Sequence, residues 1–169
     1  MSEKTTARKS TQTARKVRGI VKEMYLRAPQ AKENGDPVAY GMVGSQYDEI
    51  LHAMGIVPIW TENYAGLCAA KRVAENYLLR AEADGYSNVI CGYVRTGLGF
   101  DCMRHALGGI PEGAPDGGMA QPDLLLGSSY ACDPRFKWYQ ATGKYMDVPT
   151  YNIDVLAPPV HVDLKAVED

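Results

Sequence analysis

The chain has 169 residues, of which 46% are apolar, and it carries 18 Lys and Arg residues against 20 Asp and Glu residues. This composition excludes collagen-like and low-complexity disordered proteins and is typical of one globular domain. No apolar run approaches the roughly 18 to 20 residues that a membrane helix needs, and the N-terminus lacks the apolar core of a signal peptide. We therefore expect a cytoplasmic protein with no membrane partner.

Residues 1–36 form a basic N-terminal arm. Within residues 1–32 there are nine basic and two acidic residues, a net charge of +7, which leaves −9 for the rest of the chain. A basic arm can bind nucleic acid, but no aromatic residue interleaves the basic residues of this one before Tyr25. We therefore predict no nucleic-acid partner, and expect a frayed start followed by a helix near residues 14–26 that packs on the domain or on a partner.

A βαβ unit follows the arm. The short apolar run at 38–43 predicts a strand, and Ser45 with Asp48 three residues later resembles a capping box that opens a helix. Gly55 can end this helix in the left-handed conformation, and residues 56–60 are the next predicted strand.

Helices dominate the middle of the chain. An apolar stripe predicts one helix over 65–83 that stops at Gly85, and a further helix runs from about 88 to 106. After a Gly- and Pro-rich loop at 108–118, the wholly apolar run Leu124 to Leu126 indicates a strand buried on both faces.

A helix over 134–146 and a strand over 150–153 complete the alternation. The predicted fold for residues 37–157 is therefore a Rossmann-like α/β subdomain, in which helices flank a doubly wound parallel sheet and the N-terminal helical arm precedes it. We expect residues 158–169 to begin a linker.

Ligands of such sheets gather at the carboxyl ends of the strands, which here precede residues 44–46, 61–64 and 127–133. Cys132 lies in the third segment and would open the next helix, where free N–H groups and the helix dipole favour a thiolate. Such a thiolate is a natural nucleophile or iron ligand. The alternative is a small apolar side chain that fills space.

Cys91, near the start of the 88–106 helix, poses the same question, and the two helix-start cysteines could converge on one ion or cluster. Cys68 and Cys102 lie in mid-helix and are expected to be core thiols. The spacing of the four cysteines matches no zinc ribbon or finger, and the glycines match no phosphate-binding loop. We interpret the three histidines, His52, His105 and His161, as structural.

Several short motifs resemble, in order and spacing, the 2-hydroxyacyl-CoA dehydratase and benzoyl-CoA reductase family. The resemblance covers roughly Val38 to Asp154 and rests on Thr61-Glu62-Asn63-Tyr64-Ala65, Gly85-Tyr86-Ser87, Cys91-Gly92-Tyr93-Val94-Arg95, Pro122-Asp123-Leu124-Leu125-Leu126, and Cys132-Asp133 with Lys137-Trp138.

This resemblance implies an oxygen-sensitive catalytic subunit that works beside a paralogous subunit in a heterodimer. It holds a [4Fe-4S] cluster through cysteines of two Rossmann-like subdomains, and Cys91 and Cys132 match the first two ligands. The third would come from a C-terminal subdomain, and the sequence ends at Asp169 before that point. We therefore expect an N-terminal portion or a split subunit that is inactive without the missing region or a partner.

In the family, a separate iron–sulfur activator hydrolyses ATP and supplies a low-potential electron, which the cluster passes to a CoA thioester. The favoured expectation is a benzoyl-CoA-reductase-like subunit that acts on an aryl-CoA. The alternatives are a 2-hydroxyacyl-CoA dehydratase subunit, which expels the hydroxyl through a ketyl radical, and a cluster-free structural paralogue whose basic arm docks on an acidic subunit.

Three further residues, Glu62, Tyr93 and Arg95, lie in the matching motifs and are candidate catalytic groups. They could donate protons, orient the thioester oxygen or stabilise local charge. Each also has a structural alternative: Glu62 caps the following helix, Tyr93 belongs to the core, and Arg95 pairs with Asp101 or Glu62. We expect Trp60 and Trp138 to serve packing.

Overall fold

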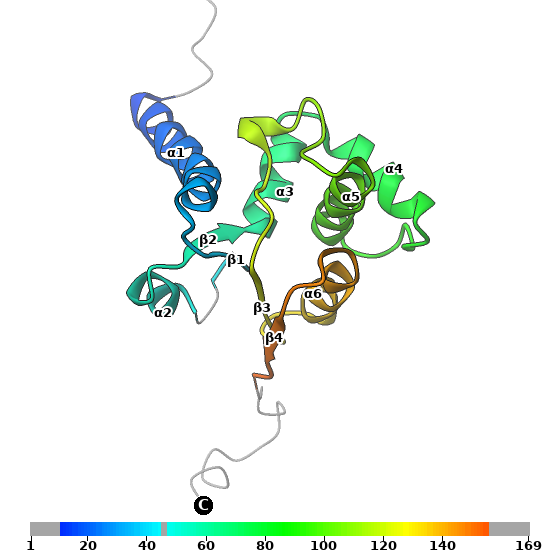
Figure 1. Ribbon diagram of the computed structural model, residues 1–169. Helices are drawn as coiled ribbons and strands as arrows, with labels where there is room; N and C mark the ends of the chain where they lie inside the picture. The colour runs from blue at the N-terminus through cyan, green and yellow to red at the C-terminus, as the bar shows by residue number, and fades with distance from the viewer. Residues whose placement is uncertain (1–10, 45–46, 156–169) are drawn as a thin grey trace, which may run out of the picture.

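A computed structural model describes residues 11–44 and 47–155 (Figure 1). The predictions for Ser45, His161 and the linker at 158–169 lie outside these ranges. The described chain contains a four-stranded, wholly parallel sheet with the strand order β2-β1-β3-β4. Its strands are β1 (Val38–Gly41), β2 (Val57–Trp60), β3 (Leu124–Ser128) and β4 (Thr150–Ile153).

The predicted α/β Rossmann-like architecture with an N-terminal helix is confirmed. The helices in chain order are α1 (Gln12–Asn34), α2 (Asp48–Ala53), α3 (Thr61–Ala70), α4 (Ala74–Ala83), α5 (Gly92–Leu107) and α6 (Asp133–Met146), with a short 3-10 turn, η1, at Pro115–Gly117.

Helices cover both faces of the sheet because successive strand residues point to opposite sides. On one face, Tyr40 and Leu125 join the main core, to which α1, α3, α4, α5 and α6 contribute. On the other face, Ala39 and Leu126 pack with Leu51 of the short α2. This two-sided burial explains the continuous apolar run of β3.

The single helix predicted over residues 65–83 is wrong. The structure has two helices, α3 and α4, because Arg72 between them adopts the left-handed conformation (φ 60°). The helix α3 also begins earlier than expected, at Thr61 directly after β2. The apolar stripe continues across the break, since both helices pack on the same core. For that reason periodicity did not reveal it.

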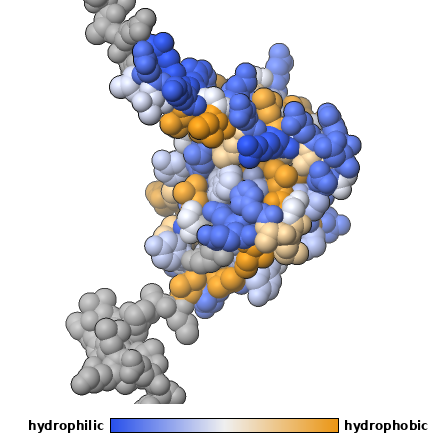
Figure 2. Space-filling view, turned by 90° about the vertical axis from the view of Figure 1, so that its left-hand side faces the viewer, coloured by the Kyte–Doolittle hydropathy of each residue, from blue (hydrophilic) through white to orange (hydrophobic). Residues whose placement is uncertain are grey.

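The arm helix α1 is longer than the 14–26 segment predicted from the sequence. It runs through Pro29 to Asn34 and ends at Gly35 in the left-handed conformation. Burial of Tyr25, Ala28 and Ala31 against the domain offsets the helix-breaking tendency of the proline. Toward its N-terminus, α1 stands clear of the domain and is exposed. Figure 2 shows hydrophobic surface beside the hydrophilic end of this helix.

None of the helices described by the structure is long and apolar enough to cross a membrane.

Candidate functional site

The carboxyl edge of the sheet brings together three segments that the sequence predicts as ligand-facing. Strands β1 and β3 are neighbours, yet β1 connects to β2 on one side and β3 connects to β4 on the other. A crevice forms at such a point in doubly wound sheets, between the loops that leave the two strands. Here those loops are residues 42–44, within the described range, and residues 129–132, and α3 begins beside them after β2.

Both helix-start cysteines occupy N-cap positions. Cys132 is the N-cap residue of α6 and Cys91 that of α5, neither side chain makes a capping hydrogen bond, and both are exposed. Ala131, just before Cys132, has a φ of 81°, a conformation that non-glycine residues rarely adopt. Free N–H groups and the positive end of the helix dipole at an N-cap stabilise a thiolate. The two positions therefore have the exposure and the field that metal-binding cysteines need.

The other two cysteines are core thiols, as predicted. Cys68 and Cys102 are buried. Burial raises the pKa of Cys68 to about 11 and that of Cys102 to about 12. These thiols therefore stay protonated and are poor ligands.

Helices α5 and α6 pack in parallel, and their register relates the two N-caps. Gly97 lies against the indole ring of Trp138, and the Thr142 hydroxyl donates to Asp101 at 3.3 Å. Further along, the rings of His105 and Tyr145 are 6.0 Å apart. Because the contacts advance in the same direction on both helices, the two N-caps lie at the same end of the helix pair.

The donor chemistry of this end suits an iron–sulfur cluster in part. Two exposed thiols at helix N-caps are the right ligand type, but a cubane cluster needs more than two protein or exogenous ligands. Within residues 11–44 and 47–155, no three His, Cys, Asp or Glu side chains form a group that could hold a metal ion. The remaining ligands would have to come from outside the described residues.

An ion pair that the sequence did not reveal lies at the same edge. Arg135, in the first turn of α6, places its guanidinium 3.1 Å from the carboxylate of Glu62 in the first turn of α3. The Val43 N–H donates to Glu62 at 2.9 Å, and Arg135 donates to the Val43 carbonyl. The pair thus contacts both the N–H and the carbonyl of Val43 in the loop after β1 and joins three elements. Arg135 is the site residue that motif matching missed.

A second hydrogen-bond chain joins the same three elements. The Tyr139 hydroxyl of α6 donates to the Gly41 carbonyl at the end of β1 (2.7 Å), and it lies 2.7 Å from the hydroxyl of Thr61 at the start of α3. Both side chains are fully buried. The carboxyl edge is therefore held by buried polar contacts, which favours a preorganised site.

An open cavity of about 610 Å³ adjoins the ion pair. Glu62, Arg135 and Tyr93 line it together with apolar side chains from α1, the loop after β1 and α3. Tyr93 also borders a neighbouring cavity of about 390 Å³ that Cys91 lines. The structure thus brings Glu62, Tyr93 and the Cys91 helix start to one region.

The structural alternatives for these residues are wrong. Glu62 does not cap α3, because the N-cap is Trp60 and the Glu62 carboxylate contacts the Val43 N–H and Arg135 instead. Tyr93 is not a core residue, since it is 54% exposed. Arg95 pairs neither with Asp101 nor with Glu62. Instead it forms an ion pair with Glu82 and donates to the Ile90 carbonyl at 3.2 Å. Arg95 does not line either cavity at this edge, so of the three candidate catalytic residues only Glu62 and Tyr93 share a cavity.

Trp138 is packed as expected, whereas Trp60 is half-buried and donates its indole N–H to Asp48.

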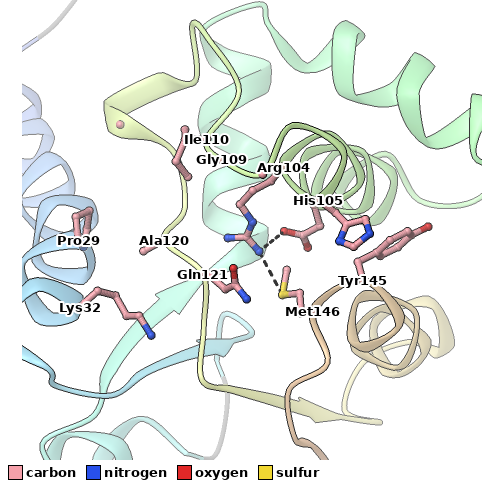
Figure 3. Close-up of a pocket in the computed structure, with 13 residues that line it drawn as sticks. Pro29, Lys32, Arg104, His105, Gly109, Ile110, Ala120, Gln121, Tyr145 and Met146 are labelled. Carbon is pink, nitrogen blue, oxygen red and sulfur yellow. Dashed lines mark hydrogen bonds and ion pairs between the residues drawn. The ribbon is translucent and has the colours of Figure 1, made fainter.

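A separate cavity of about 580 Å³ lies at the opposite end of α5 and α6, where Arg104, His105 and Met146 line it (Figure 3). The Arg104 guanidinium is already bonded to Asp101 (3.2 Å), the Tyr40 hydroxyl (3.1 Å) and the Met119 carbonyl (3.0 Å). The Arg104 guanidinium is therefore already paired with groups of the protein itself. This arrangement is typical of a structural network.

The chain has a Rossmann-like α/β fold with an open cavity, an ion pair and exposed thiols at the carboxyl edge of its sheet, which is where sheets of this kind bind ligands. The chain belongs to the family described as 2-hydroxyglutaryl-CoA dehydratase, D-component, whose family model matches residues 47–167. This finding confirms the resemblance carried by the motifs.

Relatives with curated names fall into both branches of the family. The (R)-phenyllactyl-CoA dehydratase alpha subunit of Clostridium sporogenes is 31% identical over 156 residues, which cover 92% of this chain and 36% of the relative. The (R)-2-hydroxyisocaproyl-CoA dehydratase alpha subunit of Clostridioides difficile is 30% identical over 139 residues, covering 82% of this chain and 32% of the relative.

A benzoyl-CoA reductase subunit of Thauera aromatica is 26% identical over 131 residues, covering 78% of this chain and 29% of the relative. The chain therefore spans about a third of the length of these relatives.

Proposed function

We propose that this chain forms the Rossmann-like subdomain of an alpha-type subunit in a 2-hydroxyacyl-CoA dehydratase. The observation that carries the proposal is the shared carboxyl edge, where two exposed N-cap cysteines, the Glu62–Arg135 pair and an open cavity lie together. The dehydratase branch is preferred to the reductase branch because the relatives at 30% identity and above are dehydratase alpha subunits. This preference reverses the order that we expected from the sequence.

Cys91 and Cys132 are the residues that we assign as ligands of a [4Fe-4S] cluster. Such a cluster, when bound, supplies a low-potential electron for the thioester. The protein's contribution is to present two exposed sulfurs at the N-termini of α5 and α6, where the positive ends of the helix dipoles favour a negatively charged ligand set.

Glu62 and Tyr93 border the cavity in which the thioester would lie. The Glu62 carboxylate is held by Arg135 and by the Val43 N–H, so its orientation is set before a ligand arrives. Among the described residues, both contacts go to one carboxylate oxygen, Oε2, and the proposal assigns proton exchange with the substrate to the other oxygen, Oε1. The exposed Tyr93 hydroxyl can donate a hydrogen bond toward a thioester oxygen.

A companion paralogous subunit and an ATP-hydrolysing activator belong to the same proposal. The relatives' names describe them as subunits, and Val43 and Tyr93 expose apolar surface at the cavity rim. Exposed apolar surface of this kind marks binding sites for ligands or other chains.

Benzoyl-CoA-type reduction is the second candidate, favoured by the 26% identical reductase relative. Product analysis separates the two. The native complex, captured through a tag on this chain, is incubated anaerobically with activator, ATP and a strong reductant. A dehydratase converts a 2-hydroxyacyl-CoA to an enoyl-CoA and needs ATP only to start turnover, because the electron is recycled.

A reductase instead converts an aryl-CoA to a dienoyl-CoA with continuous ATP use. If the aryl-CoA is reduced and the 2-hydroxyacyl-CoA is untouched, the reductase assignment replaces ours. If neither reacts, and Cys132→Ser changes nothing, the chain is a structural paralogue and the proposal is wrong.

A further inference from the structure

The cavity beside Glu62 has predominantly apolar walls. Val21 of α1, Val43 after β1 and Leu67 of α3 line it with the aromatic ring of Tyr93. Gly66 adds space, because it has no side chain and a Cβ there would lie 3.6 Å from the Tyr93 ring. Val43 and Tyr93 are 48% and 54% exposed. An apolar ligand group would cover this surface and remove it from water.

The two charged side chains in the cavity wall form an ion pair with each other. Glu62 and Arg135 are the charged residues of its described lining, and they pair with each other at 3.1 Å. Arg135 also donates to the Val43 carbonyl and is only 6% exposed. No cation of the described lining is therefore available to a ligand.

We infer that this cavity accepts the acyl side chain of the thioester and selects neutral, apolar acyl groups, aryl or branched alkyl, over acyl groups that end in a carboxylate. The inference rests on the proposed function and adds the class of substrate. An apolar acyl group gains from burial against Val43, Leu67 and Tyr93. A terminal carboxylate loses hydration and finds no positive partner there.

Binding of unreactive thioesters tests this selectivity without turnover. The native complex, captured through this chain, is titrated calorimetrically with 3-phenylpropanoyl-CoA, 4-methylpentanoyl-CoA, glutaryl-CoA and acetyl-CoA, none of which carries a 2-hydroxyl group. Acetyl-CoA measures the contribution of the CoA moiety. The two apolar thioesters should bind at least about tenfold more tightly than either glutaryl-CoA or acetyl-CoA, as expected for burial of one apolar side chain.

Two variants introduce a cation at the cavity rim, Tyr93→Arg and Val43→Arg. Each should lower the preference for 3-phenylpropanoyl-CoA over glutaryl-CoA by roughly threefold or more, which is the effect of one new exposed ion pair. Leu79→Arg is the control, because Leu79 is 58% exposed on α4 and does not line the cavity. It should leave the preference unchanged.

Equal or tighter binding of glutaryl-CoA would overturn the inference and leave the proposed function intact. Equal affinity for all four thioesters would also overturn it, because another part of the protein would then cover the cavity. Failure of every thioester to bind would remove the proposed function, and the inference with it.

Discussion

The indole ring of Trp138 lies directly against the Cα atom of Gly97. A Cβ atom at position 97 would lie 2.0 Å from ring atom Cζ2, so only glycine permits this approach of α6 to α5. Gly97 follows Cys91 by six residues, and Trp138 follows Cys132 by six residues. The contact therefore sets the register in which the two N-cap cysteines share one end of the helix pair.

Gly97→Ala should lower the free energy of unfolding by about 1–3 kcal/mol, because the indole ring has to move out of a packed core. Urea denaturation of the variant measures this effect. Gly19→Ala is the matched control, since nothing lies within 4 Å of its added Cβ. That change should be neutral or stabilising by up to roughly 1 kcal/mol. Equal stability of the Gly97→Ala variant and the wild type would contradict the close packing.

Local signals were sufficient to predict most of the fold. The order of strands and helices along the chain follows from the apolar run at 124–126 and from the helix-ending glycines. The predicted strand at 150–153 matches β4. The break at Arg72 and the extension of α1 past Pro29 depend on packing with distant parts of the chain. Periodicity along the sequence does not contain that information.

The four cysteines should differ sharply in their reactivity. In the folded protein without a bound cluster, iodoacetamide should modify Cys91 and Cys132 first, because both are exposed at helix N-caps. Cys68 and Cys102 should react only after unfolding, since burial raises the pKa of both thiols. Mass spectrometry of peptides over a time course measures the order. Early labelling of Cys68 or Cys102 would be inconsistent with the structure.

Arg135→Gln should loosen the segment after β1. The variant removes the cationic partner of Glu62 and the donor to the Val43 carbonyl, so Val43 keeps only the contact of its N–H with Glu62. We expect a loss of stability of about 1–3 kcal/mol and faster hydrogen exchange at the Val43 amide. Arg80→Gln breaks the exposed pair with Asp84 and should change neither quantity measurably. An unaltered rate of hydrogen exchange at the Val43 amide would contradict the role of Arg135 in holding this segment.

The sequence identified one half of this site and missed the other. Glu62 was a candidate because it lies in a recognisable motif, whereas Arg135 lies 73 positions further along the chain. Their contact depends on the parallel sheet, which brings the starts of α3 and α6 to the same edge. A lone arginine after Cys132 carries no local signal of that partnership.

Asp101 should make stability depend on pH. Burial raises the pKa of this carboxyl to about 6, although the Arg104 charge and hydrogen bonds from Thr142 and Tyr40 oppose the shift. Between about pH 4 and 6, the Asp101 carboxyl is therefore protonated in the folded protein and ionised in the unfolded chain. The free energy of unfolding contributed by this group falls as pH rises through that window and is constant above it.

Denaturation of wild type and Asp101→Asn at pH 4, 5, 6 and 7 measures this contribution. The difference in stability between the two proteins should change between pH 4 and 6 and stay constant from about pH 7 upward. Asp36→Asn, at an exposed position, serves as the control and should give no such trend. A difference that is independent of pH would show that folding does not raise the pKa of Asp101 and would contradict the structure.

The iron content of four single cysteine variants tests the central assignment most directly. The native complex is isolated anaerobically through this chain, and iron, acid-labile sulfide and visible absorption are measured for each variant. Cys91→Ser and Cys132→Ser should each lose most of the iron, the sulfide and the brown absorption band, because each removes an exposed N-cap ligand. Cys68→Ser and Cys102→Ser should retain them at the wild-type level. If the first two variants hold as much iron as the wild type, the carboxyl edge of this sheet does not carry the cluster.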